Sequence, residues 1–67
     1  MNDEWVCIYS TDREYRAELL KIMLSEHDIE CVILNKQDSS YKMFGEVEIH
    51  TRRDDAVRAI HLINKHN

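Results

Sequence analysis

The apolar residues of the chain fall into three short runs that predict strands. Glu4 to Tyr9 is rich in aromatic and β-branched residues and is too short for a useful helix. Ile29 to Leu34 is apolar almost without interruption, which is typical of a strand covered on both faces. Phe44 to Thr51 alternates, with Val47 and Ile49 on one side, so this strand is predicted to have one face in water.

Two stretches between and after these runs repeat their apolar residues at helical spacing. Each starts with a predicted capping box, Thr11-Asp12-Arg13-Glu14 or Thr51-Arg52-Arg53-Asp54, in which the threonine hydroxyl accepts a backbone N–H. The polar residues Glu26 to Asp28 are expected to end the first helix. The predicted core-facing residues are Ala17, Leu20, Met23 and Leu24 in the first helix and Ala56, Ala59, Ile60 and Ile63 in the second.

The first helix carries a second apolar stripe, formed by Tyr15, Leu19 and Ile22. Two interpretations of this stripe are open. It is either the flank of a wide core-facing surface, which we favour slightly, or a contact with another chain.

The element order is therefore β-α-β-β-α, in a single domain over residues 1–67. A right-handed crossover through the first helix leaves a gap between the first two strands, and the third strand fills it antiparallel to both. The predicted fold class is α+β: a ferredoxin-like, three-stranded antiparallel sheet of order 1-3-2, with two helices on one face and the fourth strand missing. The fourth strand would have paired with the first, so that edge is expected to be bare.

The other face of this sheet has no helix to cover it. If Val6, Ile8, Val47 and Ile49 point at the helices, alternation places Trp5, Cys7 and Tyr9 on the open face, beside Glu46, Glu48 and His50. Large apolar patches in water mark interfaces, and a chain of 67 residues builds only a small core. We therefore predict a homodimer through this face or the first-strand edge, with Trp5, Cys7 and Tyr9 as candidate interface residues; the alternative is that Trp5 folds against the chain's own core.

The longest polar stretch, Asn35 to Gly45, holds the only glycine and is the candidate ligand loop. Long connections in compact domains are functional or mobile. Its hydroxyls, amides and cations suit a small anion or polar metabolite, and the candidate ligand-binding residues are Asn35, Lys36, Asp38, Ser39, Ser40 and Tyr41. The favoured alternative is a plain hairpin connection in which Asp38 and the serines bond to their own backbone.

Charge and composition exclude several classes of partner. The formal net charge of −4 opposes a phosphate backbone, and Glu46 and Glu48 stand where an RNA-binding sheet needs aromatic residues. No phosphate-binding GxxxxGK[ST] motif is present, no apolar run reaches the roughly 18 residues of a membrane span, and the acidic start is unlike a signal peptide. We expect a cytoplasmic protein that binds neither nucleic acid nor membranes.

The sequence offers no catalytic or metal motif. The four histidines, His27, His50, His61 and His66, are scattered, so we expect surface histidines and no metal site. Cys7 and Cys31 lack CxxC spacing and are expected to be small buried hydrophobes rather than a disulfide. No nucleophile has a base beside it, so we expect no catalytic residue, no cofactor and no enzymatic activity.

Short motifs in a fixed order nevertheless resemble one bacterial family over nearly the whole chain. They are Trp5-Val6, Tyr9-Ser10-Thr11, Ala17-Glu18-Leu19, Val32-Ile33-Leu34-Asn35-Lys36, Asp38-Ser39-Ser40-Tyr41 and Phe44-Gly45-Glu46-Val47-Glu48-Ile49. The chain resembles the family described as putative prokaryotic signal-transducing protein, in the form found in Bacteroidetes. The resemblance implies a ferredoxin-like fold akin to the nitrogen-regulatory PII-like proteins and brings no substrate, cofactor or catalytic residue. Two positions depart from the family: Asp28 stands for its usual glycine, and Thr51-Arg52 for its usual Val-Pro.

Two functional hypotheses follow, both for a small, non-enzymatic regulatory module that acts by binding. In the first, the loop from Asn35 to Gly45 senses an unidentified small ligand. In the second, the chain is a protein-interaction adaptor that uses the open sheet face or the first-strand edge.

Overall fold

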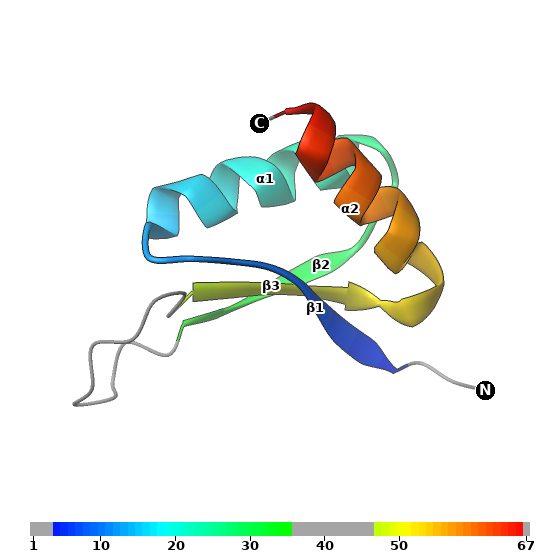
Figure 1. Ribbon diagram of the computed structural model, residues 1–67, viewed down its shortest axis with the longest axis horizontal. Coiled ribbons are helices and arrows are strands. Elements are labelled where there is room, and N and C mark those ends of the chain that lie inside the picture. The colour runs from blue at the N-terminus through cyan, green and yellow to red at the C-terminus, as the bar shows by residue number, and fades with distance from the viewer. Residues whose placement is uncertain (1–3, 36–46, 67) are drawn as a thin grey trace.

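The computed structural model describes residues 4–35 and 47–66 of the chain (Figure 1). The predicted element order is confirmed. The elements are β1 (Trp5–Thr11), α1 (Glu14–Glu26), β2 (Cys31–Asn35), β3 (Val47–Arg52), a short 3-10 turn η1 (Arg53–Asp55) and α2 (Ala56–Lys65).

The three strands form one sheet of order β1-β3-β2, and β3 runs antiparallel to both neighbours. Both helices lie on the same side of this sheet, as Figure 1 shows. The predicted α+β, ferredoxin-like arrangement is therefore confirmed. Within the described residues, β1 and β2 are the two edges, and no element covers the face opposite the helices.

The core lies between the sheet and the two helices. On β3, Val47 and Ile49 are fully buried, which confirms the alternation predicted for this strand. The other buried apolar residues are Ala17, Leu20, Leu24, Ile29, Cys31, Ala59 and Ile63.

Thr51 is the one buried polar residue among those described, and it belongs to β3 rather than to a helix start. Its hydroxyl donates a hydrogen bond to the backbone carbonyl of Glu30, just before β2. The predicted capping box at Thr51 is therefore wrong: the turn η1 precedes α2, and no side chain caps either of them. The buried hydroxyl is satisfied across the sheet, where an unpaired one would cost roughly 1–3 kcal/mol.

The capping box at the start of α1 is also wrong. The helix begins at Glu14, Arg13 occupies the N-cap position, and no side-chain hydrogen bond caps the helix. Thr11 is the last residue of β1, and its hydroxyl accepts the backbone N–H of Arg13 at 3.2 Å. The threonine thus fixes the turn between strand and helix rather than the first helical turn.

The end of α1 is a Schellman motif. The backbone N–H of Ile29 donates to the carbonyl of Leu24 at 3.0 Å, and that of Asp28 donates to Ser25 at 3.1 Å. Asp28 takes a φ of 63°, the left-handed conformation that the motif requires at this position. Leu24 and Ile29, which flank it, are both buried in the core. The motif turns the chain from α1 into β2 and anchors that turn by apolar packing.

The outer sides of both helices are more apolar than we expected. Ile60 is exposed rather than core-facing, and Leu62 packs against the core in addition to the predicted residues. The second stripe of α1, Tyr15, Leu19 and Ile22, is more than half exposed, so its interpretation as a core flank is wrong. These side chains are apolar surface of the described chain.

We predict that Asp28→Gly stabilises the protein. A residue with a Cβ in the left-handed region costs about 1–2 kcal/mol. Aspartate recovers part of this cost through local hydrogen bonds of its side chain. Glycine loses part of the gain because it has more conformational entropy in the unfolded chain. We expect a gain of about 0.5–1 kcal/mol in the free energy of unfolding, measured by urea denaturation, and a rise in Tm of about 2–8 °C.

Asp28→Ala is the matched control, because it keeps a Cβ and loses the carboxylate. It should lower stability, since alanine at positive φ is strained. Equal stability of the glycine and alanine variants would contradict the role assigned to the backbone at this position.

Candidate functional site

The open face of the sheet consists of residues that lie opposite one another on neighbouring strands, with β3 in the middle. In the register of the sheet, Cys7 lies opposite His50 and Ser10 lies opposite Glu48 on the β1 side, and Trp5 lies opposite Arg52. On the β2 side, Val32 pairs with His50 and Leu34 pairs with Glu48. Directly opposed residues share a face, so these eight residues form one surface, which we call the open face.

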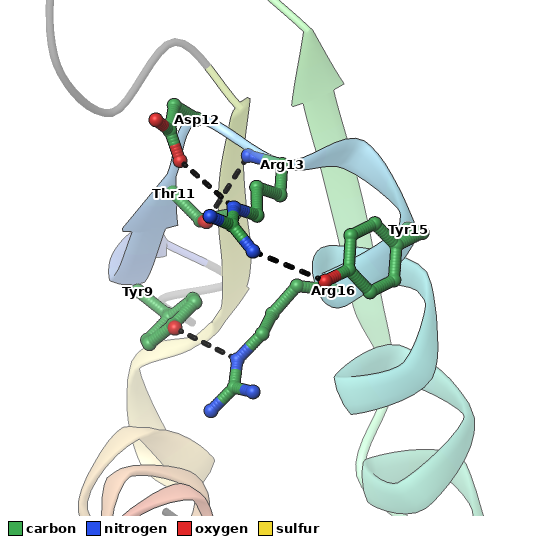
Figure 2. A network of polar contacts seen from close by, with 6 residues as sticks. All are labelled: Tyr9, Thr11, Asp12, Arg13, Tyr15 and Arg16. Atoms are coloured by element: carbon green, nitrogen blue, oxygen red, sulfur yellow. Dashed lines mark hydrogen bonds and ion pairs between the residues drawn. The ribbon is translucent and has the colours of Figure 1, made fainter.

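The strand register places Trp5 and Cys7 on the open face, as predicted, but it does not place Tyr9 there. The register skips Ile8, a β-bulge, so that Tyr9 lies opposite Ile49, whose side chain is buried on the helix side. Tyr9 packs against the core, and its hydroxyl accepts a hydrogen bond from Arg16 Nε at 3.3 Å (Figure 2). Tyr9 is therefore wrong as an open-face residue, because one extra residue in β1 shifts the alternation of the strand.

A polar network around Tyr9 holds the turn between β1 and α1 (Figure 2). Arg13 Nη1 donates to the Tyr15 hydroxyl at 3.4 Å, and Arg13 Nε lies 4.0 Å from the Asp12 carboxylate. The hydrogen bond to Tyr15 and the nearby Asp12 raise the pKa of Arg13 above its usual value. The contacts of Arg13 are exposed and join near neighbours in sequence, whereas the partly buried bond between Arg16 and Tyr9 links α1 to β1.

At one end of the open face, Trp5 is covered by its own chain. The Arg52 guanidinium carbon lies 5.2 Å from the centre of the Trp5 ring, a cation–π contact. The same guanidinium pairs with the Glu30 carboxylate at 2.9 Å. Trp5 is half-buried as a result. The indole ring is therefore shielded by a charged side chain, and it does not fold into the core as the alternative interpretation had it.

The middle of the open face gathers three groups of different chemistry. His50 Nε2 lies 2.9 Å from a Glu48 carboxylate oxygen, and one ligand atom from each of Cys7, Glu48 and His50 lies within 4.8 Å of the others. Glu48 and His50 are each about one-fifth exposed. The Cys7 thiol donates weakly to the Tyr9 carbonyl at 3.5 Å, across the bulge.

The expectation that both cysteines are buried is wrong for Cys7, which is exposed, and right for Cys31. Burial raises the pKa of the Cys31 thiol, although its hydrogen bond with Thr51 acts in the other direction. The two thiols are both free. Cys7 is therefore the cysteine that is available for chemistry. The alternation of the strands predicted that Glu48 and His50 share its face, and the register of β1 against β3 brings the three side chains together.

The exposed apolar part of the open face lies on β2. Val32 and Leu34 are 41% and 43% exposed, whereas Cys31 and Ile33 turn toward the helices. The prediction of a strand covered on both faces is thus wrong within the described chain. The apolar run in the sequence leaves two large aliphatic side chains uncovered beside His50 and Glu48 of β3.

The candidate ligand loop falls almost wholly outside the described residues. Of its six candidate residues, only Asn35 is described, and its side-chain amide donates to the Glu14 carboxylate at 3.3 Å. Lys36, Asp38, Ser39, Ser40 and Tyr41 lie outside the described residues. The loop hypothesis stays a prediction.

Two shallow grooves beside α1 were not anticipated from the sequence. One has a volume of about 350 Å³ and lies between the end of α1, the start of β2 and Asp55. The other, of about 360 Å³, lies where Ile22 of α1 meets Ile33 of β2. Lys21 and Ser25 line both grooves. No buried polar side chain points into either groove without a partner among the described residues, so neither has the features of a built binding site.

Comparison with protein families gives a match over residues 5–66, to the family described as putative prokaryotic signal transducing protein. The chain belongs to this family. The family description names a signalling role and no ligand, partner or reaction. Comparison with curated proteins and with solved structures found no match. Among the described residues, no helix is both long and apolar enough to cross a membrane.

At position 28 the chain has aspartate where the family usually has glycine, and the backbone conformation shows what this difference means. The resemblance implied a glycine at this position, and the φ of 63° at Asp28 is the conformation that glycine adopts without strain. This member of the family keeps the turn and replaces the residue that suits it best.

We predict that Arg52→Met uncovers Trp5, the only tryptophan of the chain. Loss of the cation–π contact should raise the quenching of Trp5 fluorescence by acrylamide and lower stability by about 0.5–1 kcal/mol. Arg53→Met is the matched control, because Arg53 pairs with Glu4 at 3.6 Å and no contact with Trp5 is involved. Equal quenching in the two variants would contradict the shielding of Trp5 by Arg52.

Proposed function

We propose that the protein is a small, non-enzymatic signal-transducing module that acts by binding, and that it forms a homodimer through the open face. The observation that supports this best is the pair of exposed aliphatic side chains, Val32 and Leu34, on a sheet face that no helix of the described chain covers. The exposed Cys7 lies on the same face, on the other side of β3. Apolar side chains gathered on an uncovered face mark association sites.

The charges of the open face support a second copy of the chain as the occupant. Arg52 lies at one end of β3 on this face, and Glu48 lies two residues beyond His50 toward the other end. A two-fold axis that runs across the strands reverses the strand direction of the second copy. Each cationic end then lies over an anionic end, and β2 lies over β2, so that Val32 and Leu34 pack against their equivalents.

The size of the open face indicates a weak dimer. The strands are five to seven residues long. With a spacing of about 4.8 Å between strands and a rise of about 3.3 Å per residue, the face measures roughly 15 Å by 20 Å. Such a contact buries less than about 1,200 Å² in total, the range of transient signalling encounters. A micromolar dimer suits a module whose association is regulated.

The chemistry of the described residues supports binding rather than turnover. Ligand atoms of Cys7 and His50 lie within 4.8 Å of each other, but neither residue lines either of the two grooves beside α1 in which a substrate could be held. We propose a cytoplasmic setting, which suits the two free thiols of Cys7 and Cys31. The loop from Asn35 to Gly45 remains a proposed ligand segment of this module.

We predict that Val32→Lys weakens the dimer. Loss of a buried valine costs about 1.5–3 kcal/mol, so the dissociation constant should rise by roughly 10-fold to 100-fold. Sedimentation velocity over a dilution series of the reduced, untagged protein measures this constant. Because the side chain is exposed in the single chain, the variant should keep its far-ultraviolet circular dichroism, and its Tm should equal that of the wild type at concentrations below the wild-type dissociation constant.

Two matched variants test other apolar surfaces of the molecule. Leu19→Lys lies on the α1 stripe and Val57→Lys lies on α2, and both side chains are exposed. Neither variant should change the mass distribution. A wild-type monomer at every concentration, or a dimer broken by one of these two variants instead of Val32→Lys, would refute the open-face dimer. Amide exchange slowed only along β1 would assign the contact to the strand edge.

A further inference from the structure

We propose that Cys7, Glu48 and His50 form a binding site for a zinc-type divalent metal ion on the open face. The three residues supply a thiolate, a carboxylate and an imidazole, and one ligand atom of each lies within 4.8 Å of the others. The site is assembled within a single chain. It therefore stands whether or not the proposed dimer forms.

The sheet backbone brings these three groups together. Cys7 and His50 are directly opposite each other in the β1–β3 register, so their side chains leave the same face side by side. Glu48 precedes His50 by two residues on β3, which puts both on that face. The ligands stand on two paired strands rather than on loops, so little backbone ordering is needed on binding.

The geometry needs only a small adjustment to hold a metal. Ligand bonds to zinc are about 2.0–2.3 Å long, so ligand atoms around one ion lie roughly 3–4 Å apart. His50 Nε2 and the Glu48 carboxylate oxygen are already 2.9 Å apart, and a metal ion would replace the hydrogen bond between them. The Cys7 thiol would also give up its weak bond to the Tyr9 carbonyl. Rotation of the Cys7 side chain toward His50 completes the set.

The donor set selects the class of ion. A thiolate, an imidazole and a carboxylate are zinc ligands, whereas magnesium and calcium prefer oxygen ligands alone. With the Cys7 thiol and the Glu48 carboxyl both deprotonated, two negative charges balance the charge of a divalent ion. The nearest cation on β3, Arg52, is engaged by Trp5 and Glu30 at the end of the face. The charge balance at the site is thus favourable to a divalent cation.

The coordination of the metal is incomplete with three protein ligands. A tetrahedral ion then keeps one position for water or another donor. Cys7 is exposed and His50 and Glu48 are partly exposed, so this position faces solvent. In the proposed dimer it would face the second copy of the chain. A metal ion bound here would change the surface through which two chains associate, so association would respond to the metal concentration.

Cobalt substitution tests the site directly. Untagged, reduced and chelator-treated protein is titrated with Co²⁺ under anaerobic conditions, and the absorption spectrum is recorded. We expect one ion per chain, a near-ultraviolet band from thiolate-to-cobalt charge transfer, and visible bands of a low-coordinate ion. Competition with a chromogenic chelator then gives the Zn²⁺ affinity.

Substitution of each ligand separates the proposed site from other thiols and histidines. Cys7→Ser should abolish the charge-transfer band, and His50→Gln and Glu48→Gln should each lower the Zn²⁺ affinity at least about tenfold. His61→Gln is the control, because His61 is an exposed histidine on α2, and it should leave the affinity unchanged. A Co²⁺ spectrum without a thiolate band, or equal Zn²⁺ affinity in wild type and in Cys7→Ser, would overturn the proposal.

Metal binding and dimer formation are measured separately. Stoichiometric Zn²⁺ binding by Val32→Lys would support the site independently of association. Metal-free wild type that still dimerises, with no Zn²⁺ binding at any concentration, would overturn the metal site and leave the dimer standing.

Discussion

The structure depends on the two-sided character of β3. One side of this strand buries Val47, Ile49 and Thr51 under the helices. Its other side presents Glu48, His50 and Arg52 to the open face, where they organise the side chains of β1 and β2. Because β3 lies between both neighbours, its alternation decides which residues become core and which become available for binding. The same strand thus contributes one face to the core and its other face to the candidate site.

Much of this arrangement could be predicted from the sequence, because it rests on patterns that lie within single elements. The alternation around Val47 and Ile49 identified the central strand, and the order of elements left one sheet topology. Trp5 and Cys7 were placed on the correct face for the same reason. The polar end of α1 at Glu26 was also foreseen.

What the sequence did not reveal depends on pairing between distant segments. The bulge at Ile8 follows from how β1 meets β3, and no local signal marks it, so Tyr9 was assigned to the wrong face. The close approach of Cys7, Glu48 and His50, whose ligand atoms lie within 4.8 Å of one another, depends on the same register. The two threonine motifs failed for another reason. The Thr11 hydroxyl accepts from the N-cap residue Arg13 rather than from the first helical turn, and the Thr51 hydroxyl donates to the Glu30 carbonyl across the sheet. Val32 was expected to be buried because it lies in an apolar run. The sequence shows that the residue is apolar but not whether the same chain covers it.

The bulge in β1 also bears on how large an assembly of this protein can grow. A sheet with two free edges can in principle add further chains through backbone hydrogen bonds, and head-to-tail addition of that kind has no natural end. The unpaired Ile8 interrupts the regular spacing of donors and acceptors along β1. An edge that cannot present an even ladder is a poor template for another strand, whereas stacking of two faces closes after two copies. The extra residue in β1 therefore makes this edge a poor site for strand addition, whereas the pairing of β2 shows no such interruption.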